Sequence, residues 1–139
     1  MKPHPIHPAL VHFPLGLLLT ATIVDLAHWA GLRTEPQFAA WLMAAGLIAA
    51  LPAMAAGLYD FAKLDEAVVP HALRHMGAMA LAWLSYAVAL YLRRDGLIAA
   101  ADPSTASLAM SVASALVLGL GGWLGGELVY RYGAGRIDR

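Results

Sequence analysis

The chain has 139 residues, of which 60% are hydrophobic and 13% are charged, and its formal net charge at pH 7 is zero. This composition is typical of a membrane protein, and the zero net charge argues against binding to nucleic acid. Because the sequence contains no cysteine, it excludes disulfides, thiolate-ligated iron–sulfur clusters and covalently attached c-type haem.

Four apolar stretches follow one another along the chain, at about residues 9–31, 38–61, 74–92 and 107–130. Each reaches the roughly 20 helical residues that cross a hydrocarbon core of about 30 Å. The connections between them are short and carry charges, proline and glycine, so neighbouring helices should run antiparallel. The sequence therefore predicts an all-α, multi-pass membrane protein that forms one antiparallel bundle of four transmembrane helices in a single domain.

Lysine and arginine are unevenly divided between the two sides of this predicted bundle. One side, which holds both termini and the second connection, carries Lys2, Lys63, Arg74, Arg131, Arg136 and Arg139. The other side carries Arg33, Arg93 and Arg94. Since cytoplasmic segments are enriched in these residues, we expect both termini to face the cytoplasm.

Ionisable residues gather at the edge of the membrane where the termini are expected. The apolar stretches begin or end there with His7, His12, Asp60, His71, His75 and Glu127. Such groups are costly at a membrane helix unless they are paired, hydrated or bound to a ligand, so they are candidates for a functional site.

The favoured interpretation of this edge is a non-covalently bound b-type haem that transfers electrons, to or from quinone or a redox partner protein. Its iron would take one imidazole each from His12 and His75. Its flat faces need small neighbours and its propionates need cations, and the residues that we expect to supply them are Gly16, Gly126, Arg74 and Arg131.

Two other interpretations remain open. One is a zinc or non-haem iron site for transport, sensing or enzymatic chemistry, with ligands drawn from His12, His75, Asp60 and Glu127 and with His7 or His71 as an extra ligand. The other is a structural or assembly subunit, in which these groups stabilise the bundle and contact another membrane protein.

The spacing of the polar residues also suggests an internal repeat of two helical hairpins, related by an axis along the membrane normal. In this hypothesis His12 is equivalent to His75, and Asp60 is equivalent to Glu127. Two residues that lie at the same depth in the membrane on different helices could contribute to one shared site.

The opposite edge of the membrane carries a second polar cluster. Asp25 and His28 are three residues apart on the first helix and are therefore neighbours. They suit either a carboxylate that orients an imidazole or a plain ion pair with one of the nearby arginines, Arg33, Arg93 or Arg94.

Small residues form a stripe on the fourth predicted helix, at Ser111, Ala115, Gly119, Gly122 and Gly126. Such a stripe lets helix backbones approach closely, within the bundle or in a homodimer formed through this helix.

Several of these segments match a known family. The run from His7 to Gly16, the Gly57-Leu58-Tyr59-Asp60 segment and the run from Leu124 to Gly133 resemble the DUF2231 family of small bacterial four-helix membrane proteins. The resemblance implies the bacterial inner membrane and the four-helix fold, and from it we expect His7, His12, Asp25, Asp60 and His75 to form the functional set. Some relatives carry this unit beside Rieske-type domains, which favours electron transfer by association.

Overall fold

The computed structural model describes residues 6–95, 99–100 and 102–134 of the chain. The four helices are α1 (Ile6–Trp29), α2 (Pro36–Phe61), α3 (Val69–Leu92) and α4 (Thr105–Tyr130). Between α3 and α4 lies a two-residue antiparallel ladder of β1 (Arg94–Asp95) and β2 (Ala99–Ala100). The predicted all-α class is confirmed, and all four helices are long and apolar enough to cross a membrane.

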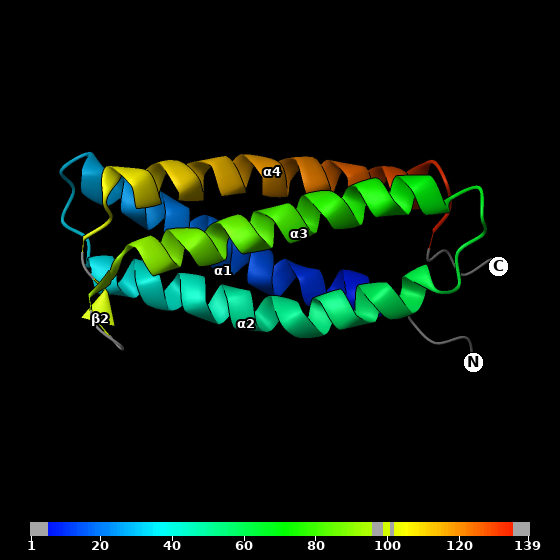
Figure 1. The fold of residues 1–139 in the computed structure, drawn as a ribbon, viewed down its shortest axis with the longest axis horizontal. Coiled ribbons are helices and arrows are strands. Elements are labelled where there is room, and N and C mark those ends of the chain that lie inside the picture. The colour runs from blue at the N-terminus through cyan, green and yellow to red at the C-terminus, as the bar shows by residue number, and fades with distance from the viewer. Residues whose placement is uncertain (1–5, 96–98, 101, 135–139) are drawn as a thin grey trace.

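The helices run alternately up and down along one bundle (Figure 1). α1 and α3 begin, and α2 and α4 end, at one end of the bundle, which we call the terminal end. The α1–α2 and α3–α4 connections lie at the other end, which we call the hairpin end. Contacts within each hairpin are extensive and those between hairpins are fewer, and α1 lies diagonally opposite α3.

Three of the orienting basic residues, Lys2, Arg136 and Arg139, lie outside the described residues. Because the four helices alternate in direction, α1 begins and α4 ends at the same end of the bundle. The side of the membrane that each end faces stays a prediction.

Local sequence signals explain where the helices begin and end. α1 ends in a turn in which Gly31 has a φ of 83° and the N–H of Leu32 donates to the carbonyl of Ala27 at 3.0 Å, as glycine after a helix allows. α3 begins at Val69, five residues before the expected start, because Pro70 is tolerated in a first helical turn. α4 begins after Ser104, whose side chain accepts from the N–H of Ser107 at 3.1 Å.

The core of the bundle is a narrow apolar column. Its centre contains Leu18, Ala21, Met43, Tyr86 and Leu118. The Tyr86 hydroxyl is buried and forms a hydrogen bond of 2.9 Å with the Thr22 hydroxyl, so its polar atom is satisfied inside the core. Large apolar side chains also cover the outer surface, among them Phe13, Ile23, Trp41, Leu81 and Leu116. An apolar exterior is what a bundle surrounded by lipid requires.

The two hairpins are related by an internal repeat with an interval of 68 residues. This interval links the buried Asp25 of α1 to the buried Arg93 just after α3, and it likewise links Leu18 to Tyr86. The glycines that pack on histidine rings, Gly57 and Gly125, share it. The expected equivalence of His12 with His75 is therefore wrong, since His7 is the residue that corresponds to His75.

Close packing of α1 on α2 predicts a strong effect of bulk at Gly46. A Cβ built there would lie 2.8 Å from Leu18 Cγ, whereas one at Gly119 would contact nothing within 4 Å. Gly46→Leu should therefore lower the free energy of unfolding by about 1–3 kcal/mol, measured by thermal unfolding in detergent. Gly119→Leu is the matched control and should have little effect. Equal stability of the two variants would contradict this packing.

Candidate functional site

His7 lies in the first turn of α1 and points toward α2. Its Nδ1 is 2.7 Å from the backbone carbonyl oxygen of Ala53. Because a carbonyl oxygen only accepts, Nδ1 carries the hydrogen, and Nε2 of the neutral ring keeps its lone pair. The ring fits there because Gly57 has no side chain: a Cβ at Gly57 would lie 3.0 Å from His7 Cε1.

His75 repeats this arrangement in the second hairpin. Its Nδ1 donates to the carbonyl oxygen of Gly121 on α4 at 2.8 Å, and a Cβ at Gly125 would lie 2.9 Å from His75 Cε1. In both hairpins the histidine and its carbonyl partner are 46 residues apart. The two imidazoles are thus held in the same tautomer by the same kind of contact.

The two rings meet across the boundary between the hairpins. Their centroids are 6.4 Å apart and their planes make an angle of 79°. Both residues are half-buried, and the described part of the chain provides no hydrogen bond to Nε2 of either ring. We call His7 and His75 the histidine pair. It presents two basic nitrogen atoms at the terminal end, each on a ring fixed by the backbone.

His12 does not take part in this arrangement. It is exposed on the outside of the bundle. The physical reason is helical periodicity, since five residues after His7 the side chain has turned well away from the face that carries His7. The expected pairing of His12 with His75 is therefore corrected to a pairing of His7 with His75.

The remaining ionisable residues of the terminal end are not gathered around the pair. His71 stacks on Tyr132, with ring centroids 4.2 Å apart, and Glu127 accepts from Arg131 at 2.8 Å on the exposed side of α4. Asp60 is half-buried. In the described residues, no three histidine or carboxylate side chains lie close enough to hold one metal ion. The expected shell of two imidazoles and two carboxylates is therefore not assembled.

The glycines that shape the site differ from those expected. A Cβ at Gly16 or Gly126 would contact nothing within 4 Å, so neither residue seats an imidazole. Gly57 and Gly125 do so instead. The signal that would have found them is in the sequence: each glycine follows its histidine by the same interval, and Gly121 and Gly125 lie four residues apart on α4. Arg74, expected near a propionate, is exposed beside His75.

The hairpin end holds a fully buried ion pair. Arg93 Nη1 lies 2.8 Å from Asp25 Oδ1 and 2.7 Å from Oδ2, and both side chains are completely inaccessible to solvent. Arg93 Nη2 also donates to the carbonyl oxygen of Pro36 at 2.8 Å. The sequence left three arginines as possible partners of Asp25, and the structure shows that Arg93 is the one. Its contacts connect α1, α2 and the end of α3.

His28 is not part of this ion pair. Its Nε2 lies 3.9 Å from Asp102 Oδ1, with the histidine partly and the aspartate largely exposed. A contact of this length between solvent-accessible groups contributes little to stability.

The buried ion pair predicts an asymmetric response to mutation. Arg93→Met should lower the free energy of unfolding by about 3–5 kcal/mol, because it leaves the Asp25 carboxylate buried without a cation. Adding Asp25→Leu to that variant should restore most of the loss, as measured by thermal unfolding in detergent. Arg131→Gln, which breaks an exposed pair, is the control. If Arg93→Met were no less stable than Arg131→Gln, the buried ion pair would not contribute to the stability of the fold.

The comparisons with known proteins agree with the family resemblance. The family model described as "Predicted membrane protein (DUF2231)" matches residues 3–138. No curated protein and no solved structure matches the chain. The matched region covers nearly the whole sequence and all four membrane-spanning helices. The chain therefore belongs to the DUF2231 family of predicted membrane proteins.

Proposed function

We propose that this protein is a membrane electron-transfer protein that holds one b-type haem between its two hairpins, with His7 and His75 as the axial ligands. The observation that carries the proposal is the histidine pair. Two imidazoles from different hairpins meet in a T-shaped contact at the terminal end, with ring centroids 6.4 Å apart.

The distance between the rings supports a shared metal ion. Two imidazoles on opposite sides of one ion, with metal–nitrogen bonds of about 2 Å, have ring centroids roughly 6 Å apart. The separation of the histidine pair agrees with this value. A direct hydrogen bond between the two rings is a poor explanation, because both are held with Nδ1–H pointing to a carbonyl and both Nε2 atoms are acceptors.

The backbone contacts of the rings support the same proposal. Histidine ligands of metal ions usually donate their second ring N–H to a carbonyl or carboxylate, which fixes the tautomer and the ring direction. Ala53 and Gly121 supply such carbonyl groups. A histidine that only stabilised the bundle would also need an acceptor for its N–H, but it would not need a matching histidine at the equivalent position of the other hairpin.

Haem, when bound, supplies a one-electron couple. His7 and His75 would hold the haem, and ligation by two histidines would suit electron transfer. The exposed guanidinium group of Arg74 lies at the same end as the pair and is suited to bind a propionate, whereas Arg131 would first have to give up its ion pair with Glu127. The electron donor or acceptor would then approach the terminal end, as a quinone within the lipid or as a partner protein.

The proposal predicts different effects for His7 and His12, which both lie in the first part of α1. His7→Ala and His75→Ala should each abolish the sharp Soret, α and β bands of the dithionite-reduced protein purified in detergent. His12→Ala should keep the bands, because His12 is exposed away from the pair. The measurements are absorption spectra before and after reduction, with haem and metals quantified on the same samples.

The same spectra identify the alternatives. A colourless protein that takes up no haem on reconstitution, but retains a stoichiometric metal lost in both His7→Ala and His75→Ala, would replace haem by a non-haem ion. Protein without haem or metal would overturn a cofactor role and leave the pair as a structural contact. Loss of the bands in His12→Ala and His75→Ala, but not in His7→Ala, would restore the ligand set expected from the sequence.

Substitution at the glycines tests the site without removing a ligand. Gly125→Val should reduce the haem content several-fold, because its side chain would occupy the space of the His75 ring. Gly122→Val is the matched control on α4, since a Cβ there contacts nothing within 4 Å. Equal haem content in both variants, with both folded by circular dichroism, would mean that the ring position does not matter.

A further inference from the structure

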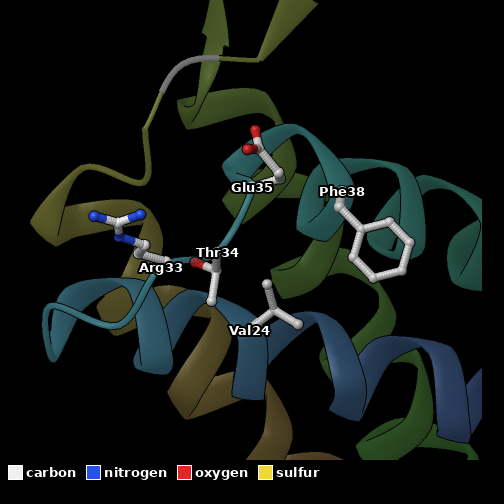
Figure 2. Close-up of a pocket in the computed structure, with 5 residues that line it drawn as sticks. All are labelled: Val24, Arg33, Thr34, Glu35 and Phe38. Atoms are coloured by element: carbon white, nitrogen blue, oxygen red, sulfur yellow. The ribbon is translucent and has the colours of Figure 1, made fainter.

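A groove of about 710 Å³ lies at the hairpin end, between the end of α1 and the start of α2 (Figure 2). Its apolar wall is made by Val24 of α1 and Phe38 of α2, and its polar rim by Arg33, Thr34 and Glu35 of the connection. Its volume is in the range of small-molecule sites. Because the connection joins two membrane-spanning helices, the groove lies where lipid headgroups meet the hydrocarbon.

Thr34, one of the residues that line this groove, carries an unpartnered hydroxyl group. Thr34 Oγ1 is buried and has no hydrogen-bond partner, and the only other such side-chain atom in the described residues is Nε of Arg93. The two atoms belong to the same end of the bundle, because Arg93 binds the carbonyl of Pro36, two residues after Thr34. Buried polar atoms are nearly always satisfied, so an unpartnered donor here indicates a missing acceptor.

The rim of the groove carries one positive and one negative side chain, and neither has an ion-pair partner among the described residues. Arg33 and Glu35 are exposed and form no ion pair with any described residue. Glu35 occupies the position before α2, yet its side chain does not cap the helix. Figure 2 shows the side chains of Arg33 and Glu35 extending away from Val24 and Phe38, with Thr34 between the charged and the apolar groups.

We infer that this groove binds a zwitterionic aminophospholipid, namely phosphatidylethanolamine. Its phosphate would accept from the Arg33 guanidinium and, once the Thr34 side chain turned toward the groove, from the Thr34 hydroxyl. Its primary ammonium would donate to Glu35, and an acyl chain would cover Val24 and Phe38. This site is independent of the histidine pair, which lies at the other end of the bundle.

The rim also predicts selectivity among lipids. The quaternary ammonium of phosphatidylcholine has no N–H group to donate to Glu35. Phosphatidylglycerol carries the phosphate without a cation, so Glu35 would repel it. Both should bind more weakly than phosphatidylethanolamine with the same acyl chains.

Native mass spectrometry of the full-length, delipidated protein tests the inference, with each of the three lipids added at equal concentration. Phosphatidylethanolamine should bind at least several-fold more tightly than phosphatidylcholine. Glu35→Gln should remove that preference, while Arg33→Gln and Thr34→Val should weaken all three lipids. Arg94→Gln is the control, because Arg94 is exposed at the same end and lies over the Tyr91 ring.

Two results would overturn the inference. One is equal binding of the three lipids to the unmodified protein, which would mean that only the apolar wall holds lipid. The other is an Arg33→Gln variant that retains phosphatidylethanolamine as well as Arg94→Gln does. Circular dichroism of each variant separates a lost site from a lost fold.

Discussion

In hydrocarbon, an unpaired polar group costs several kcal/mol, and this chain meets that constraint along the boundary between its two hairpins. Asp25 is paired there with Arg93, and the Thr22 hydroxyl with Tyr86. His7 and His75 bind backbone carbonyls of their own hairpins and face each other. Each of these contacts requires the neighbouring helix in place. The polar residues therefore make the association of α1, α2, α3 and α4 specific, which lipid-like apolar side chains alone could not do.

The internal repeat explains why these contacts lie where they do. Two pairs of residues that are 68 positions apart meet between the hairpins, namely Asp25 with Arg93 and His7 with His75. At the terminal end the equivalent residues are identical, and two histidines make a symmetric pair suited to one shared ligand. At the hairpin end they have opposite charges, and a buried pair of like charges would be strongly unfavourable. The two hairpins are thus equivalent in shape and complementary in charge.

The two polar layers are separated along the membrane normal. Asp25 follows His7 by 18 residues on α1, which corresponds to about 27 Å of helix. This distance is close to the thickness of the hydrocarbon core, so each layer lies near one boundary of the bilayer. Electron transfer at the histidine pair would therefore serve one side of the membrane. The buried ion pair lies at the opposite end of the bundle, and the groove that we propose binds a lipid lies at that same end.

Composition and periodicity determined the four spans, the antiparallel order and the edge at which the polar residues gather, because the length of an apolar helix is fixed by the bilayer. The sequence also singled out His75 as a candidate ligand, which stays a prediction, and Arg93 as one possible partner of Asp25. It did not distinguish His7 from His12, because both open the first helix and only the rotation of α1 against α2 decides which faces inward. Nor did it separate the inward glycines, Gly121 and Gly125, from the outward ones. Those choices depend on contacts between residues 46 to 68 positions apart, and only the packed tertiary structure makes them.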